Sequence, residues 1–369
     1  MQPAARCATR ATAATKAAVV SEVAILWLRR DLRLTDNPAL QAALQGGRTV
    51  LPVYIHAPEE QAPWAPGAAA HWWLHHSLQA LDAALRARGS RLLIRRGPSL
   101  DTLRQLVAET GARALHWNRL YEPMTLARDT AIKEWARDEG LEVHSHNAAL
   151  LHEPWTLETG KGEPYRVFTP FWKRCLTLPA PPPPSPAPAA IPAPPGPLDT
   201  LPLEALNLLP SIPWDGGLAA QWQPGEDSAL SRLHTFLGTA VSDYDHGREQ
   251  PAIDGTSALS AALHHGELGP RQVWHACQAL QHAGAESVTA YLREIYWREF
   301  AHHLLFHYPH TSDAPMDERF AAFPWRDDEA DLSAWQRGET GIPLVDAGMR
   351  QLWQTGWMHN RVRMIVASF

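Results

Sequence analysis

Residues 23–28 read VAILWL and are followed directly by RRDLRLTDNPAL at 29–40. The first part is an unbroken apolar run, which is typical of a β-strand that is covered on both faces of a sheet. No GxGxxG motif follows this strand, so the usual dinucleotide-binding fingerprint is absent. The run therefore predicts a buried strand in a sheet that lacks the common nucleotide-binding loop.

Similar apolar runs recur along the first half of the chain, at 50–55, 92–94 and 114–117. Stretches with helical spacing separate them. One has apolar residues from Trp73 to Leu85 before Gly89, and another ends near Gly111. This alternation of strand and helix predicts a doubly wound, Rossmann-like parallel sheet, and we expect an α/β domain over residues 23–150.

A proline-rich segment divides the chain. Residues 179–198 read PAPPPPSPAPAAIPAPPGPL, which predicts an extended, semi-rigid connector within an interdomain segment at 151–225. Beyond it, apolar residues follow helical spacing in five stretches: 230–237, 257–264, 270–282, 287–307 and 342–369. We therefore expect an all-helical domain over residues 226–369.

Composition limits the class of function. A chain of 369 residues, of which 45% are hydrophobic, suits two globular domains. Its net charge of −6 argues against nucleic-acid binding through bulk positive charge, so any DNA contact must be a local basic patch. Cys7, Cys175 and Cys277 lie far apart, which excludes a disulfide framework and a zinc motif, and no metal site is expected.

The N-terminal residues 1–22 are expected to form a disordered or targeting tail. Residues 1–21 contain no acidic residue and carry Arg6, Arg10 and Lys16, a composition similar to that of a transit peptide. A disordered tail or a misplaced start codon explains the same composition, so organellar targeting stays open. No apolar stretch is long enough to span a membrane, and we expect a cytoplasmic, nucleoid-associated bacterial protein.

Two motifs in the helical half carry residues suited to binding. Thr256, Ser257 and Ser260 follow a glycine where a loop meets a helix. Their hydroxyls and backbone N–H groups suit an anion, although a plain helix cap has the same pattern. Glu294 and Trp297 share one helix face with Arg298, which suits a binding pocket or, alternatively, an exposed face with a Glu294–Arg298 ion pair.

Four segments, taken together, resemble the DNA photolyase/cryptochrome family. They are WLRRDLRLTDNPAL at 27–40, YDHGR with DGTSALS within 244–260, YLREIYWREF at 291–300, and GIPLVDAGMR with GWMHNRVRM within 341–364. They occur in the family's order, so the resemblance spans residues 23–369. The last segment is most similar to class I photolyases, which repair cyclobutane pyrimidine dimers.

The resemblance implies a flavin enzyme with FAD in its helical domain. The positions that match the family's flavin-binding residues are Tyr244, Thr256, Ser257, Ala258, Leu259, Ser260, Tyr291, Arg298, Asn360 and Arg363. Those that match its DNA contacts are Arg248, Glu294, Trp297 and Arg361. Those implied to act in repair are Glu294, Trp297, Asn360, Met364 and, as an outer electron-transfer tryptophan, Trp325. In the implied reaction, photoexcited reduced FAD donates an electron to the dimer, whose cyclobutane bonds then break.

Asn360 and Met364 distinguish the predicted cyclobutane-dimer photolyase from two other groups of the family. Plant-type cryptochromes typically lack the methionine, and (6-4) photolyases usually carry a second histidine in place of the asparagine. The resemblance implies a monomer that binds dimer-containing DNA. Two alternatives stay open: a cryptochrome-like flavin photoreceptor without repair activity, and an inactive product, because the family's chains continue beyond Phe369 and the flavin domain is expected to be incomplete.

The identity of a second, antenna chromophore is also open. Folate-binding members of the family carry an Asn-Glu pair shortly after Tyr-Glu. Here Tyr121-Glu122 is followed by Pro123, and the pair reads Met124-Thr125. We therefore expect a different antenna, or none.

Overall fold

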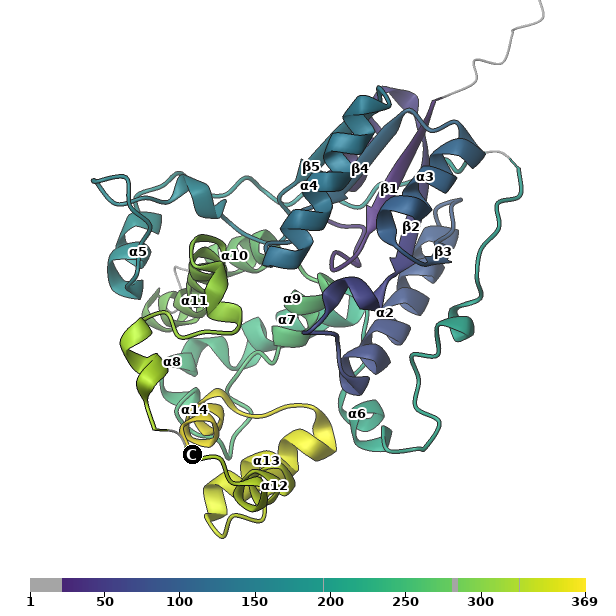
Figure 1. Cartoon of the computed structure of the whole chain (residues 1–369). Coiled ribbons are helices and arrows are strands. Elements are labelled where there is room, and N and C mark those ends of the chain that lie inside the picture. The colour runs from purple at the N-terminus through teal and green to yellow at the C-terminus, as the bar shows by residue number, and fades with distance from the viewer. Residues whose placement is uncertain (1–21, 195, 281–284, 325) are drawn as a thin grey trace, which may run out of the picture.

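The computed structural model describes residues 22–194, 196–280, 285–324 and 326–369. An α/β domain and a helical domain lie side by side (Figure 1). The predictions made for the tail at 1–21 and for Trp325 fall outside the described residues.

The sheet has five parallel strands in the order β3-β2-β1-β4-β5. Their bounds are Val23–Leu28 for β1, Thr49–His56 for β2, Leu93–Arg96 for β3, Ala114–Asn118 for β4 and Glu142–His146 for β5. The doubly wound parallel sheet is therefore confirmed, with the quoted apolar run in the middle strand. The fifth strand was not predicted, because its alternating polar residues do not form an apolar run.

Helices cover both faces of this sheet (Figure 1). They are α1 (Pro38–Ala43), α2 (Ala68–Arg86), α3 (Ser99–Thr110) and α4 (Pro123–Asp138). On β1, Leu26 packs in one buried cluster with α1 and α2, whereas Trp27 packs in a second cluster with α3 and α4. The strand is apolar at every position because both of its faces are buried.

The helical domain is built around α11, a helix of 23 residues (Ala285–His307). The other helices are α5 (Phe168–Cys175), α6 (Gly216–Gln221), α7 (Glu226–Thr239), α8 (Tyr244–Gly247), α9 (Ser260–His265), α10 (Pro270–Gln278), α12 (Glu329–Arg337), α13 (Pro343–Thr355) and α14 (Asn360–Ser368). One side of α11 packs in the main core of the domain through Tyr291, Ile295 and Phe300.

Among the expected helices, two differ in extent from the observed ones beside the candidate site. Residues 342–369 form α13 and α14 rather than one helix, because Gly356 adopts a left-handed φ of 70° and ends α13. Residues 256–259 form a loop, and α9 begins only at Ser260. Both breaks lie beside the candidate site described below.

Part of the proline-rich segment is held against the α/β domain. Ile191 is fully buried in the cluster beneath α1 and α2. The carbonyl of Pro192 accepts a hydrogen bond from Val50 N at 2.7 Å. Past the prolines, Thr200 accepts from the backbone N–H of Ile94 on β3, and Leu201 donates to the Ile94 carbonyl. The connector thus lines the outer edge of the sheet.

A group of buried and half-buried polar residues joins the two domains, and we call it the junction network: Arg33, Asp36, Glu226, Glu267 and Arg271. The Arg33 guanidinium donates to the carbonyls of Gly266 and Ala148, each at 2.9 Å, and to the Asp36 carbonyl at 2.8 Å. Glu226 accepts from the backbone N–H groups of Leu34 and Thr35. The charged run after β1 therefore fixes the position of the helical domain.

Candidate cofactor and DNA site

A cavity of about 360 Å³ opens in the helical domain between α8, α9, α11 and α14. All ten predicted flavin-binding positions line it: Tyr244, Thr256, Ser257, Ala258, Leu259, Ser260, Tyr291, Arg298, Asn360 and Arg363. They come from four separate elements, so tertiary folding brings the motifs together. Five further residues line the cavity without having been predicted: Leu263, Ile295, Trp357, Met358 and His359. Ile295, Trp357, Met358 and His359 lie within the quoted motifs, and Leu263 stands three positions after DGTSALS. The motifs themselves would therefore have pointed to them.

The loop before α9 has a geometry that suits an anion. Ala258 adopts a left-handed φ of 49° and is followed by Leu259 at φ −91° and ψ 1°. Such a pair turns successive backbone N–H groups toward one concave side. Within the described part of the chain, the N–H groups of Thr256, Ser257 and Ala258 donate to no other residue. The loop can therefore receive a diphosphate, as its predicted role requires.

Close backbone packing holds this loop against α8. A Cβ built on Gly255 would lie 2.6 Å from the Gly247 carbonyl oxygen and 2.9 Å from its Cα atom. Only glycine allows the two segments to approach in this way. The approach sets the width of the cavity between Tyr244 and the loop.

Two tyrosines line the cavity beside the loop. The rings of Tyr244 and Tyr291 meet edge to face, with centroids 5.1 Å apart. Burial raises the pKa of Tyr244 to about 12, and burial likewise raises the pKa of Tyr291. Both phenols are neutral near pH 7 and can donate hydrogen bonds.

Charged residues alternate in sign along the mouth of the cavity, and we call them the rim chain: Arg361, Glu249, Arg248 and Glu294. Arg361 donates to Glu249, whose carboxylate lies 3.6 Å from Arg248. Arg248 in turn donates to Glu294 at 2.6 Å. The alternative ion pair between Glu294 and Arg298 was wrong, because Arg298 turns inward and donates to the Ala149 carbonyl at 2.5 Å.

Trp297 and Met364, also implied in repair, do not line the cavity. Trp297 stacks on Phe168 with ring centroids 3.6 Å apart and is 45% exposed. Met364 is 55% exposed, and its Sδ atom lies 3.9 Å from Nδ2 of Asn360. One face of the indole and the thioether are therefore available to a ligand.

Comparison with known proteins identifies the family. The family model for DNA photolyase matches residues 24–189, and that for the FAD binding domain of DNA photolyase matches residues 291–369. The deoxyribodipyrimidine photo-lyase of Agrobacterium fabrum is 47% identical over 347 residues, which are 94% of this chain and 72% of that protein. The chain belongs to the DNA photolyase/cryptochrome family.

Other members show how broad this family is. Cryptochrome-1 of Arabidopsis thaliana is 38% identical over 94% of this chain and 52% of its own length. Among solved structures, a bacterial class III photolyase from Agrobacterium tumefaciens superposes with a TM-score of 0.93 at 45% identity, covering 97% of this chain and 74% of that one. The predicted class I resemblance is not tested by this likeness and stays a prediction.

FAD is the cofactor of this family's helical domain, and the cavity fits it. Its donors suit the parts of that molecule: the 256–258 loop suits the diphosphate, and the neutral tyrosines suit polar ring or ribityl atoms. Arg363 lines the cavity and forms no ion pair within the described residues, so its charge is available to the cofactor side. When bound, FAD supplies the light absorption and the electron transfer.

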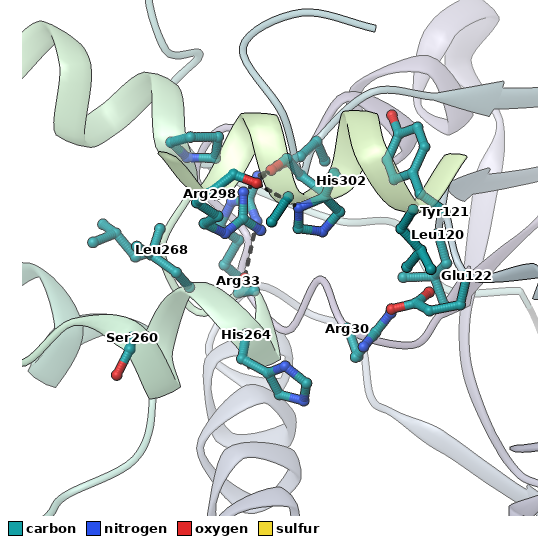
Figure 2. Close-up of a pocket in the computed structure, with 17 residues that line it drawn as sticks. Arg30, Arg33, Leu120, Tyr121, Glu122, Ser260, His264, Leu268, Arg298 and His302 are labelled. Atoms are coloured by element: carbon teal, nitrogen blue, oxygen red, sulfur yellow. Dashed lines mark hydrogen bonds and ion pairs between the residues drawn. The ribbon is translucent and has the colours of Figure 1, made fainter. Parts of the chain in front are cut away.

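A second cavity of about 410 Å³ lies between the photolyase domain and the FAD-binding domain (Figure 2). It shares Ser260, Leu263 and Arg298 with the first cavity. Figure 2 shows Arg30 and Glu122 facing each other on one side, opposite Arg298. Burial opposes ionisation of Glu122, but the Arg30 guanidinium outweighs it and lowers the pKa to about 2. The cavity is therefore ionic, and its lining is cationic overall.

Neither metal nor membrane features stand out in the described parts of the chain. Among those residues no group of His, Cys, Asp or Glu is arranged to hold a metal ion. None of the described helices is long and apolar enough to cross a membrane.

Proposed function

We propose that this chain is a deoxyribodipyrimidine photo-lyase, which uses blue light to split cyclobutane pyrimidine dimers in DNA. One observation carries the proposal: the cavity that holds the predicted flavin-binding set is also lined by Glu294, Asn360 and Arg361. A cofactor site and a polar, partly cationic mouth thus form one continuous space.

The residues at the mouth can replace what a dimer loses when it leaves the duplex. A flipped dinucleotide gives up base stacking and base pairing, and its binding pocket must supply both. The free face of Trp297 offers stacking, while Glu294 and Asn360 offer hydrogen bonds to base edges. Met364 adds an apolar contact beside Asn360.

The rim arginines suit the DNA backbone. Arg248 and Arg361 lie at the same mouth, so phosphates on either side of a flipped dimer would meet guanidinium groups. A local pair of cations is compatible with the overall charge of −6, because the potential at a surface depends on nearby charges. We further propose that the protein acts as a monomer in the bacterial cytoplasm.

A light-dependent repair assay tests this function. The purified chain, loaded with FAD and reduced, is incubated with an oligonucleotide that carries one cyclobutane thymine dimer, in blue light and in the dark. We expect the dimer to disappear only in the light. Equal loss in both conditions would refute the proposal.

A cryptochrome-like photoreceptor is the second candidate, favoured by the 38% identity to Cryptochrome-1. A chain that holds FAD and changes its flavin spectrum in light, yet leaves the dimer intact and binds dimer-containing and undamaged DNA equally, would support it. Asn360 and Met364 favour repair over this alternative. Their amide and thioether lie together, where they can offer a dimer a hydrogen bond and an apolar contact.

A further inference from the structure

The rim chain links three helical elements through side chains alone. Arg361 comes from α14, Arg248 and Glu249 follow α8, and Glu294 lies on α11. Two guanidinium groups and two carboxylates alternate, so the chain is neutral as a whole. In the free protein, both arginines that face the mouth are therefore already paired.

The proposed function, on which this inference rests, assigns Glu294 to base edges and Arg248 and Arg361 to phosphates. In the free protein these side chains are instead paired within the rim chain. If Glu294 binds base edges, Arg248 loses its 2.6 Å partner. If Arg361 binds a phosphate, Glu249 loses its own partner. A charged group that gives up a partner without gaining another opposes binding. Lesion binding is favourable only where the partners rearrange together.

Glu249 stands where it can carry out that rearrangement. Its carboxylate contacts Arg361 and lies 3.6 Å from the Nε atom of Arg248, so the two arginines share it. Its side chain is half exposed and therefore has room to rotate toward Arg248. Glu249 is not itself part of the cavity lining, and the family motifs gave it no role.

We propose that Glu249 is a specificity-determining residue that couples base recognition to phosphate recognition. When the bases of a dimer bind Glu294, Arg248 pairs with Glu249 through its Nε atom and keeps its terminal N–H groups for the phosphate beside it. Arg361 is then released to a second DNA phosphate. With undamaged DNA, Glu294 stays on Arg248, Glu249 stays on Arg361, and the phosphate must compete with a carboxylate. The rim chain thus weakens binding to DNA that presents no flipped bases.

Binding of the full chain to two labelled oligonucleotides tests this coupling. They share one sequence, and one of them carries a cyclobutane thymine dimer. Removing the charge in Glu249→Gln frees Arg361 before any DNA binds. We expect affinity for the undamaged oligonucleotide to rise by about 2–5-fold, the range of an exposed ion pair. Its log–log salt slope should steepen by about one, because one more phosphate is neutralised. The gain for the dimer should be smaller, so the preference for damage falls.

Three variants serve as controls. Glu142→Gln on β5 makes the same change in net charge far from the rim chain (Figure 1). Glu249→Asp keeps the carboxylate and should restore discrimination. Adding Arg361→Met to Glu249→Gln should abolish the gain for undamaged DNA, because the released guanidinium is then absent.

The outcomes separate the coupling from the proposed function. A wild-type chain that binds both oligonucleotides equally refutes the proposed function and the coupling with it. A wild-type preference for the dimer that survives unchanged in Glu249→Gln refutes only the coupling. An equal gain in Glu142→Gln also overturns it, since the effect would then be one of overall charge.

Discussion

The junction network and the rim chain are built from the same residue types, arginines and carboxylates, but they behave as opposites. Arg33 is 1% exposed, and its guanidinium is satisfied mostly by backbone carbonyls. In the rim chain, Arg361 and Glu249 are 36% and 50% exposed and are satisfied by each other's side chains. A backbone carbonyl cannot move without its chain, whereas the end of an exposed side chain can. The buried charged groups therefore keep fixed partners, whereas the exposed charged groups can exchange theirs.

The largest effect is expected at Arg33. Arg33→Met leaves the buried carbonyls of Gly266, Ala148 and Asp36 without a donor, which should lower the free energy of unfolding by about 3–5 kcal/mol. Denaturant unfolding followed by circular dichroism measures it. Arg86→Met is the control, because Arg86 is 65% exposed in its pair with Asp82. Similar losses in both variants would break the comparison.

A pH-dependent effect is expected at Glu267. Its carboxylate accepts from Trp73 and Ser77 of α2, yet burial raises its pKa to about 7. Between about pH 4.5 and 7 the folded state holds a proton that the unfolded state has lost, so stability due to this group falls as pH rises. Glu267→Gln removes the titration. It should match the wild type near pH 5 and exceed it by about 1–3 kcal/mol near pH 8.

Unfolding curves of Glu267→Gln and the wild type at several pH values supply this measurement. The exposed Glu339, paired with Arg337, provides a matched Glu→Gln control whose stability should follow the wild type throughout. Parallel curves for Glu267→Gln and the wild type would show that this buried carboxyl does not titrate in the predicted window.

A smaller effect, confined to the cofactor, is expected at Gly255. Gly255→Ala forces the loop away from Gly247, and overpacking of this kind costs about 1–3 kcal/mol. We expect FAD affinity to fall by roughly tenfold, which corresponds to about 1.4 kcal/mol. Flavin absorbance retained after desalting reports it. Gly238→Ala on α7 has no atom within 4 Å of the new Cβ and should keep its flavin.

The smallest effect on stability is expected at Arg361. Arg361→Met removes an exposed ion pair, which should change the free energy of unfolding by about 0–1 kcal/mol. Its binding to dimer-containing DNA should nonetheless lose about one unit of log–log salt slope. A large loss of stability together with an unchanged slope would assign Arg361 to structure and remove the contrast with Arg33.

Much of the fold followed from local pattern. The run at 23–28 predicted a strand buried on both faces, and β1 is that strand. The edge strand β5 was missed because only one of its sides is covered, so Glu142 and His144 interrupt the apolar signal. The break at Gly356 was also missed, since helical spacing continues on both sides of it.

The sequence named candidate site residues, but it did not reveal which of them contact one another. Family motifs supplied the flavin-binding positions, and all of them line one cavity. The pairing of Glu294 with Arg248 joins residues 46 positions apart, which spacing along one helix cannot reveal. Spacing favoured Arg298 instead, whose guanidinium is drawn inward by the Ala149 carbonyl across the domain junction.

The proline-rich connector has a further consequence for how this molecule meets other molecules. An open sheet edge offers unpaired backbone groups on which a foreign strand can dock and start aggregation. At the outer edge, the N–H and carbonyl of Ile94 are already engaged by Thr200 and Leu201. At the opposite edge, β5 presents Glu142, His144 and His146, which suit water better than another sheet. The connector between the domains therefore also blocks this edge against pairing with a strand of another molecule. Its prolines lack the N–H groups that would continue the β-sheet hydrogen bonding.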